Sequence, residues 1–598
     1  MEKLKLPLNT IEVLKRRYLL KDNNRNIIEE PSELFRRVAH NIAKAETSYG
    51  SDVSLPQVEE QFYFMMKNLE FLPNSPTLMN AGTTFGQLSA CFVLPIEDSI
   101  DGIFKSLRGM AKIHQTGGGT GFNFSHLRPK GDLVYSTKGE ASGPVSFMSI
   151  FNQATGVIVQ GGKRRGANMG ILRCDHPDIV EFIEAKNKES AFLNFNLSIG
   201  VTDKFMRAVL KKENFALINP RTQKKTRYVN AAEIFDILAE SAWKAGDPGI
   251  VFLDEINRKH PLKGLGYVEA TNPCGELPLL PFESCNLASI NLAKMVSNGN
   301  IDWQRLKKTV HWGIRFLDNI IDINRFPLKE IKKITLANRK IGLGVMGFAD
   351  MLIELEVPYT SYKAVESAAE LMRFIHEESL IASQKLAKER GVFTNFKKSI
   401  YARKNIKMRN ATVNTIAPTG TISIIANCSS GIEPLFALSF VRNVLSGSRL
   451  FEINPLFESE MKKRNLFNKS LMTEVAKRGS IQNIKRIPKD LKRIFVTAFD
   501  VTPRHHVEVQ AAFQRYTDNA VSKTINLPEK ATIADVKDIY LLAYKLKCKG
   551  ITIYRYGSKE DQVLSFGYDK KSKFVTLDNR LTVTSEYSGG CASGICPF

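Results

Sequence analysis

Short apolar segments alternate with longer stretches of helical periodicity from residue 72 to about residue 557. Short runs rich in β-branched and aromatic residues are typical of buried strands, and helical segments between them indicate crossovers that join parallel strands. The strand-like segments include residues 249–253, 289–292, 412–416 and 551–554, and the helical segments include residues 364–390 and 535–547. The alternation predicts an α/β fold with a largely parallel sheet over residues 71–557.

The two ends of the chain differ from this central part. Residues 1–70 are expected to form a helical N-terminal region, because apolar residues recur at helical spacing in residues 11–18, 32–44 and 57–71. Residues 558–598 lose the alternation. They are predicted to form a flexible tail, since glycine and serine are frequent near the end.

Glycine-rich segments punctuate the central part. Residues 116–121, 160–166 and 417–421 are of a kind that lets backbone N–H groups approach phosphate oxygens closely. Residues 342–347 have nearly the spacing of a dinucleotide-binding loop, but we interpret them as a tight helix-packing segment. Each signal alone is weak, because glycine turns are common in α/β proteins.

The formal net charge of +23 has two interpretations. It favours a polyanionic ligand such as a nucleotide, and a lysine-rich composition explains it equally well. The basic residues are dispersed and no nucleic-acid-binding motif stands out, so neither nucleic acid nor a membrane is expected as a partner. A basic nucleic-acid-binding protein stays the non-enzymatic alternative. With no signal-peptide pattern and no apolar run of bilayer length, we expect a cytoplasmic protein.

Eight cysteines in 598 residues are too few for a secreted disulfide framework. No CxxC pair occurs, so no metal site is predicted. Cys591 and Cys596 stand out because both lie in the glycine- and serine-rich last residues. A cysteine pair on a mobile tail is better suited to moving electrons than to holding a fold.

The most informative string is Thr271-Asn-Pro-Cys-Gly-Glu276. In an extended segment, side chains two positions apart point the same way, so Asn272, Cys274 and Glu276 can converge on one small ligand. A buried structural cysteine in a turn explains the same string. Residue spacing alone leaves both interpretations open.

This string resembles the active-site loop of ribonucleotide reductase large subunits. Other strings agree with that family in the same order along the chain and together span residues 72–555. They are Leu72-Pro-Asn-Ser-Pro-Thr-Leu-Met-Asn-Ala-Gly-Thr83, Leu88-Ser-Ala-Cys-Phe-Val93, Gly117-Gly-Gly-Thr-Gly-Phe122, Arg164-Arg-Gly-Ala-Asn-Met169, Glu283-Ser-Cys-Asn-Leu-Ala-Ser-Ile-Asn-Leu292, Ala417-Pro-Thr-Gly-Thr-Ile-Ser423, Ser429-Ser-Gly-Ile-Glu-Pro434 and Gly550-Ile-Thr-Ile-Tyr-Arg555.

The resemblance implies roles in the reduction of ribonucleotides to 2′-deoxyribonucleotides. Cys274 would carry a transient thiyl radical and abstract the 3′-hydrogen of the ribose. Glu276 would take the 3′-hydroxyl proton as an ordinary ionised carboxylate, and Asn272 would hydrogen-bond the ribose hydroxyls. The 3′-radical lets the protonated 2′-hydroxyl leave as water. Cys91 and Cys285 would supply two electrons and end as a disulfide.

The tail cysteines would then re-reduce that disulfide by thiol–disulfide exchange. A thioredoxin-like protein would be the external reductant of Cys591 and Cys596.

The family also implies two nucleotide sites. A ribonucleoside di- or triphosphate substrate would contact Ser75, Ala90, Gly119, Pro418, Thr419, Gly420, Thr421 and Ile422. A dNTP or ATP effector of substrate specificity would bind near Asp98, Ser99, Ile100, Arg128 and Lys163. Two loops, roughly residues 128–138 and 160–169, would couple effector to substrate. The sequence leaves the assembly state open between a monomer and a homodimer.

The class of reductase depends on the segment Thr552-Ile-Tyr-Arg-Tyr556. Class I subunits carry two adjacent tyrosines here, whereas Arg555 separates the pair. The segment looks like the adenosylcobalamin-dependent (class II) branch, so adenosylcobalamin is the expected cofactor. No Asp-x-His-x-x-Gly motif is present, but this branch is expected to bind the corrin without a histidine on cobalt. The alternative is a class I subunit that needs a separate metal-containing radical-generating subunit.

For the fold, the family implies a ten-stranded α/β barrel built from two antiparallel five-strand halves. Cys274 would lie at the tip of a loop that threads the barrel.

Overall fold

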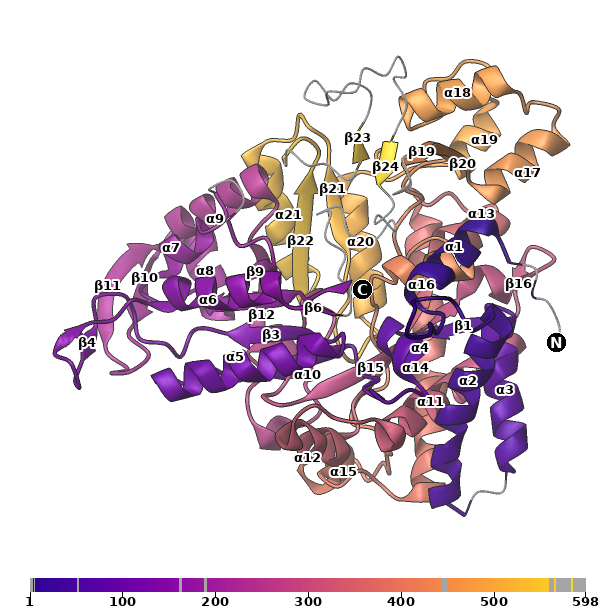
Figure 1. Ribbon diagram of the computed structural model, residues 1–598. Coiled ribbons are helices and arrows are strands. Elements are labelled where there is room, and N and C mark those ends of the chain that lie inside the picture. The colour runs from indigo at the N-terminus through magenta and orange to yellow at the C-terminus, as the bar shows by residue number, and fades with distance from the viewer. Residues whose placement is uncertain are drawn as a thin grey trace.

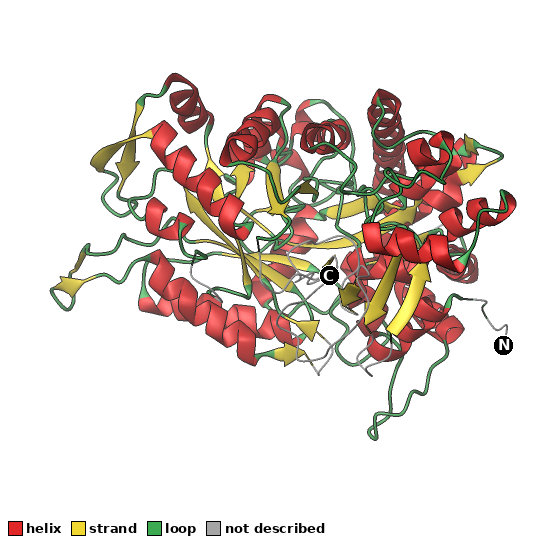
Figure 2. Ribbon diagram, turned by 90° about the horizontal axis from the view of Figure 1, so that it is seen from above, coloured by secondary structure: helices red, strands yellow, loops and turns green. Residues whose placement is uncertain are grey.

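The computed structural model describes residues 4, 6–50, 53–160, 164–187, 191–443, 449–558, 564–565 and 582–584. Helices surround a ten-stranded sheet in a mixed α/β architecture (Figures 1 and 2). Among the described residues, none of the helices combines the length and the apolar character needed to cross a membrane.

The first part of the chain is helical, as predicted. It forms α1 (Leu8–Arg17), α2 (Pro31–Ala43) and α3 (Leu55–Lys67). A proline in the first turn and a capping box fix where α2 and α3 begin. The apolar faces of α2 and α3 pack against each other and against α11 (Trp303–Ile323), which attaches the N-terminal region to the rest of the fold.

The central sheet has the strand order β1-β15-β2-β3-β8-β9-β12-β22-β21, with β18 also paired to β15. β2, β3, β8, β9 and β12 run parallel, as do β15 with β18 and β21 with β22. These groups meet antiparallel at β2·β15 and at β12·β22. The bounds are β1 Phe71–Pro73, β2 Cys91–Leu94, β3 Gly119–Asn123, β8 Asn168–Arg173, β9 Phe195–Val201, β12 Gly249–Phe252, β15 Ser284–Asn291, β18 Ile341–Met346, β21 Thr524–Leu527 and β22 Gly550–Arg555.

The predicted helix-packing segment at residues 342–347 is wrong, because most of it is strand β18. A Cβ added to Gly344 would lie 2.2 Å from the carbonyl oxygen of Thr415, and one added to Gly342 would lie 2.6 Å from the Thr415 side chain. The two glycines are therefore required by the close approach of residues 412–416, which form single bridges to β18 and to Val521.

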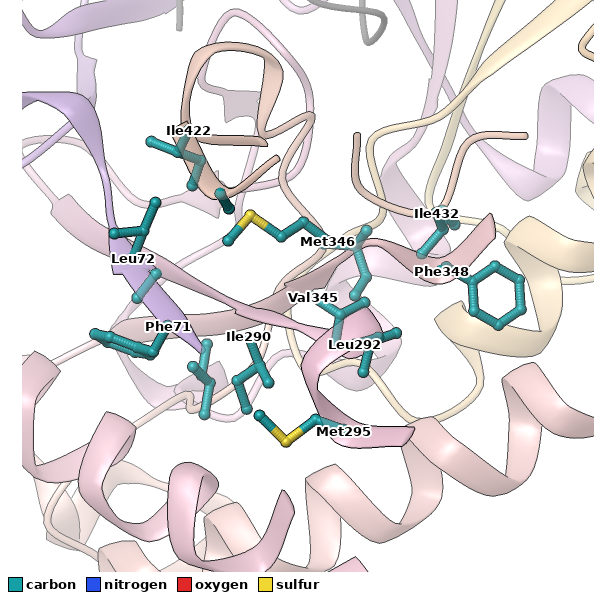
Figure 3. Close-up of a cluster of buried hydrophobic side chains, with 14 of the residues drawn as sticks. Phe71, Leu72, Ile290, Leu292, Met295, Val345, Met346, Phe348, Ile422 and Ile432 are labelled. Carbon is teal, nitrogen blue, oxygen red and sulfur yellow. The ribbon is translucent and has the colours of Figure 1, made fainter. Parts of the chain in front are cut away.

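A buried apolar cluster fixes the short helix α16 (Gly420–Ala426) against the sheet (Figure 3). Phe71, Ile290 and Val345, from β1, β15 and β18, are fully buried in this cluster, and Ile422 of α16 packs into it. The burial holds the start of α16 beside the edge of β15.

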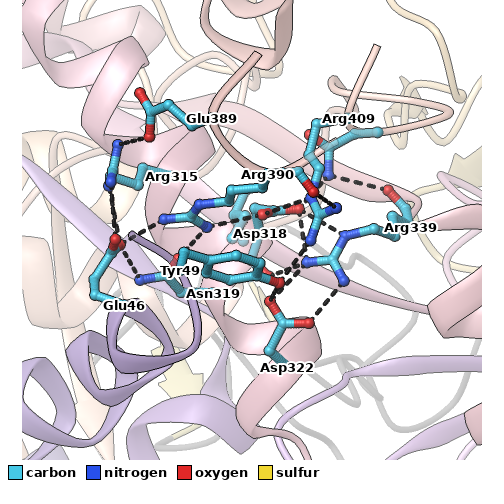
Figure 4. A network of polar contacts seen from close by, with 12 residues as sticks. Glu46, Tyr49, Arg315, Asp318, Asn319, Asp322, Arg339, Glu389, Arg390 and Arg409 are labelled. Carbon is cyan, nitrogen blue, oxygen red and sulfur yellow. Dashed lines mark hydrogen bonds and ion pairs between the residues drawn. The ribbon is translucent and has the colours of Figure 1, made fainter. Parts of the chain in front are cut away.

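A buried polar network joins α11 to the end of α14 (Tyr362–Arg390) (Figure 4). Asp318, with no exposed surface, pairs with Arg339 at 2.8 Å, Arg390 at 3.0 Å and Arg409 at 3.3 Å. Arg390 also reaches Glu46, in the 3-10 helix that follows α2, at 2.7 Å. Burial alone would raise the pKa of Asp318, but the three guanidinium groups hold it well below its ordinary value.

Replacing Asp318 by Asn removes the charge that compensates these buried arginines. We expect Asp318→Asn to lower the free energy of unfolding by about 3–5 kcal/mol, measured from urea denaturation curves. The matched control is Asp490→Asn, which breaks the exposed pair with Arg464 and should change stability little. Similar losses in the two variants would contradict a dominant role for the buried network.

Candidate active site

The string that contains Cys274 forms a hairpin-like finger. Its two sides are β13 (Ala270–Thr271) and β14 (Pro278–Leu279), which pair antiparallel. The finger packs against β3 so closely that a Cβ on Gly121 would lie 1.7 Å from the carbonyl oxygen of Thr271. Glycine at this position of β3 lets the finger reach the interior of the sheet.

Three hydrogen bonds from distant segments anchor the tip of the finger. Thr415 Oγ1 and the backbone N–H of Ala520 both donate to the carbonyl oxygen of Glu276, each at 2.8 Å. Asn196 Nδ2, from β9, donates to the carbonyl oxygen of Pro273 at 2.8 Å. The tip backbone is thus held on both sides of Cys274, which is itself half-buried.

Asn272 is fully buried at the base of the tip. Its Nδ2 donates to the sulfur of Cys91 at 3.1 Å, and its Oδ1 accepts from the backbone N–H of Leu277 at 2.9 Å. The second bond fixes the orientation of the amide, which leaves its N–H group directed at the thiol.

Cys91 and Cys285 are direct cross-strand partners on β2 and β15. Directly opposed residues of antiparallel strands have Cα atoms about 4.5–5.5 Å apart, within the range that a disulfide spans. Neither forms a disulfide, and neither has exposed surface. Burial raises the pKa of the Cys285 thiol far above its ordinary value, so it is a thiol at neutral pH.

Glu276 is the most unusual group of the site. Its side chain is 1% exposed, and neither carboxylate oxygen has a hydrogen-bond partner among the described residues. Burial raises its pKa to about 7, so the expectation of an ordinary ionised carboxylate needs revision. A buried carboxyl group without partners is available to a ligand that offers hydroxyl groups.

Glu276 faces a cavity between β15 and the first turns of α4 (Ser75–Asn80) and α16. Its lining residues include five of the eight predicted substrate contacts, namely Ser75, Ala90, Pro418, Thr419 and Ile422. Gly420, Thr421 and Gly119 are not among the lining residues, although the Gly119 N–H donates to the carbonyl oxygen of Ala90 at 2.8 Å.

Cys274 faces a second cavity, on the other side of the finger tip. The strands β9, β12 and β22 form its walls together with α20 (Pro503–Gln514). Gln510 of α20 is 1% exposed, and its Oε1 has no hydrogen-bond partner among the described residues. The wall therefore presents a buried acceptor to any ligand that lies beside Cys274.

The predicted effector residues cluster at the start of α5 (Ile100–Gln115). Arg128 Nε pairs with Asp98 Oδ2 at 2.9 Å, and the Ser99 hydroxyl caps α5 by accepting from the backbone N–H of Gly102. Ile100 is 62% exposed. Lys163 and the tail pair Cys591 and Cys596 lie outside the described residues.

Sequence reasoning missed the residues that anchor the tip and those with unused polar atoms. Asn196 interrupts an otherwise apolar strand, and Asn74 lies inside the Pro73-Asn-Ser-Pro76 string, so both carried a weak signal. Asn74 lines the Glu276 cavity and its Nδ2 has no partner among the described residues. Thr415 and Ala520 act through the backbone of the finger, which no local pattern reveals.

Comparisons with known proteins agree over nearly the whole chain. Residues 89–554 match the family described as "Ribonucleotide reductase, barrel domain", and residues 4–86 match "Ribonucleotide reductase, all-alpha domain". The chain is 50% identical to the "Vitamin B12-dependent ribonucleoside-diphosphate reductase" of Thermoplasma acidophilum, over 99% of this chain and 86% of that relative. It is 49% identical to the protein of the same name from Mycobacterium tuberculosis, over 100% and 83%.

A solved structure has a similar fold. The "Actinobacillus ureae class Id ribonucleotide reductase alpha subunit" aligns with a TM-score of 0.76 and 23% identity, over 92% of this chain and 97% of that chain. At this identity the likeness concerns the fold alone.

The cross-strand register predicts which thiols pair on oxidation. Mild oxidation of the folded protein should link Cys91 to Cys285, detected as one cross-linked pair in a peptide map. Cys285→Ser should remove this linkage, whereas Cys174→Ser should leave it intact, because Cys174 is buried in another cluster. A disulfide from Cys91 to Cys274 in the wild type would contradict the geometry.

Proposed function

The chain belongs to the ribonucleotide reductase family, and from this premise we propose that it reduces ribonucleoside diphosphates to 2′-deoxyribonucleotides with adenosylcobalamin. One observation carries the proposal. Glu276, whose buried carboxylate oxygens have no hydrogen-bond partner in the described part of the chain, and Asn272, bonded to the thiol of Cys91, lie on the same finger tip as Cys274. These are the base, the ribose-orienting group and the thiols that the reaction requires.

The residues divide the reaction between them. A thiyl radical on Cys274 takes the 3′-hydrogen, while Glu276 accepts the 3′-hydroxyl proton. The 2′-hydroxyl then leaves as water with a proton from Cys91. Cys91 and Cys285 together give two electrons and two protons and become a disulfide: one proton leaves in the water, and the other, with the two electrons, forms the new C2′–H bond. Glu276 returns its proton to the 3′-oxygen, and Cys274 returns the hydrogen atom to C3′ and is a thiyl radical again. The raised pKa of Glu276 suits this task, because a base works best when its pKa is close to the working pH.

The cavity beside Cys274 fits the adenosyl part of the cofactor. The unused Oε1 of Gln510 and the amide of Asn196 can hydrogen-bond its hydroxyl and amino groups, and Gly246 and Gly550 leave room at the wall. When bound there, adenosylcobalamin supplies the organic radical chemistry. The residues of this chain position the ligand and exclude water around the Cys274 sulfur.

The cavity at Glu276 supports the substrate assignment. The Ser75 hydroxyl and the backbone of residues 418–422 would bind the diphosphate, and the unused Nδ2 of Asn74 would add a donor. The ribose would lie between Ala90, Gly119 and Glu276, and this orientation would bring C3′ to Cys274.

We place the specificity effector, a dNTP or ATP, at Asp98, Ser99, Ile100, Arg128 and Lys163. The loops of residues 128–138 and 160–169 would transmit its identity to the substrate. Exposed apolar side chains on the adjacent helices α5 and α6 (Pro144–Val157) offer a surface for a homodimer. They are Ile100, Phe104, Ile150 and Val157.

The tail assignment rests on the sequence. Cys591 and Cys596 would exchange with the Cys91–Cys285 disulfide and be re-reduced by a thioredoxin-like protein. We retain the division into residues 1–70, 71–557 and 558–598, and the few cysteines favour a cytoplasmic enzyme.

We also propose that the sheet closes into a ten-stranded barrel of two antiparallel five-strand halves. The bridges Leu343↔Asn414 and Ile416↔Val521 support closure, because they connect β18 through residues 412–416 to the segment that enters β21. The finger would then thread this barrel.

The two alternative functions explain fewer of these findings. Relatives named for vitamin B12 dependence favour the cobalamin mechanism over a class I subunit. A nucleic-acid-binding function would explain only the net charge of +23 and would leave the buried thiols and the Glu276 carboxyl group unexplained.

The proposal is tested with the purified chain, a ribonucleoside diphosphate and a small dithiol. We expect deoxynucleotide formation that requires adenosylcobalamin. Cys274→Ser should reduce the rate by more than about a thousandfold while substrate binding persists, because only the radical-bearing atom is lost. Cys428→Ser, which changes another half-buried cysteine, is the control and should stay active. Turnover without cobalamin, or a Cys274→Ser rate near wild type, would refute the assignment.

A further inference from the structure

The N-terminal helix α1 lies directly behind the Glu276 cavity. It packs on α16 in Figure 1, and the buried hydroxyl of Thr10 donates to the carbonyl oxygens of Ile424 at 3.1 Å and Ile425 at 3.3 Å. The helix therefore contacts the same short element whose first turn lines the cavity.

Tyr18, the C-cap residue of α1, reaches the cavity wall itself. Tyr18 is 2% exposed, and its Oη lies 2.7 Å from the Oγ of Ser75, which lines the cavity. The bond joins groups 57 positions apart in the chain. Tyr18 is not among the lining residues of the cavity, and its hydrogen bond to Ser75 connects it to the cavity wall.

Either hydroxyl can be the donor in this bond, and the chemistry of the two groups favours Tyr18. A serine hydroxyl has one proton and two lone pairs. A phenol is a far stronger acid than an aliphatic alcohol, so it is the better donor. When Tyr18 donates to Ser75, the single proton of Ser75 is left for an acceptor inside the cavity. A phosphate oxygen is such an acceptor and has no proton to offer in return at neutral pH.

The N-terminal region also holds the far end of α4, the helix that begins with Ser75. Arg37 of α2 donates to the carbonyl oxygens of Ala81 and, at 3.5 Å, Leu78, and its guanidinium is fixed by Glu29 at 2.7 Å. Both ends of α4 are thus held from the same side, which keeps Ser75 in one place when a ligand arrives.

We propose that Tyr18 is a positioning residue of the substrate site: it orients the Ser75 hydroxyl toward the phosphate of a ribonucleoside diphosphate. This inference rests on the proposed function, since it takes the Glu276 cavity as the substrate site. It gives the N-terminal helical region a part in substrate binding, in addition to its packing on α11.

The test is a double-mutant cycle on reductase activity. Tyr18→Phe keeps the ring and removes the donor, so KM for the diphosphate substrate should rise about five- to tenfold while kcat stays within about twofold. Ser75→Ala should raise KM at least as much. Adding Tyr18→Phe to Ser75→Ala should cause no further rise, because the hydroxyl group that Tyr18 orients is already gone.

Tyr540→Phe is the matched control. Tyr540 is also buried and donates to a backbone carbonyl oxygen, that of Pro248 at 3.1 Å, but it contacts neither α4 nor α16. Its KM should equal that of the wild type.

Two results would overturn the inference: an unchanged KM in Tyr18→Phe, or an equal rise of KM with and without the Ser75 hydroxyl. A wild-type chain that forms no deoxynucleotide would instead contradict the proposed function, so the two failures are distinguishable. Thermal unfolding of each variant confirms that it is folded at the assay temperature.

Discussion

The finger and the cavities on either side of it are arranged around one buried carboxyl group, that of Glu276. Holding Glu276 in the interior without a close hydrogen-bond partner among the described residues costs free energy, because a buried carboxyl group loses its water and the nearby Asn272 amide offsets only part of that loss. Hydrogen bonds to the finger backbone hold this residue in place: the carbonyl oxygen of Glu276 accepts hydrogen bonds from both Thr415 and Ala520. The backbone carbonyl group thus has its hydrogen-bond partners, and the side-chain carboxyl group stays available to a ligand.

The same finger separates two cavities and gives each a different task. Glu276 faces the cavity bounded by α4 and α16, whereas Cys274 faces the cavity bounded by β9, β12 and β22. In the proposed reaction, the radical would reach Cys274 from one side while the substrate lies on the other. Cys91, which lies against the amide of Asn272 and opposite Cys285, would put the reducing thiols on the substrate side. This separation would keep the radical source away from the dithiol.

Local signals allowed much of the fold to be predicted. The N-terminal helices and the strands at residues 249–253 and 551–554 follow from periodicity and residue composition, whereas Cys274 and Glu276, which the spacing placed on one ligand, line different cavities. Residues 342–347 show where such reasoning fails. Gly344 is required by the carbonyl oxygen of Thr415 and Gly342 by the Thr415 side chain, and neither by a helix packed nearby. The raised pKa of Glu276 could not be predicted from the sequence for the same reason, because burial is a property of the assembled sheet.

The fold removes water from around Glu276 and thereby raises the pKa of its carboxyl group to about 7. Infrared difference spectroscopy can follow the carboxylic acid band of this one residue, with Glu276→Gln as the subtraction control, while the pH is varied. The protonated band should persist through mildly acidic pH and disappear around pH 7, so that the basic form grows as the pH rises through 7. Loss of the band near the ordinary glutamate value of about 4.3 would contradict the claim.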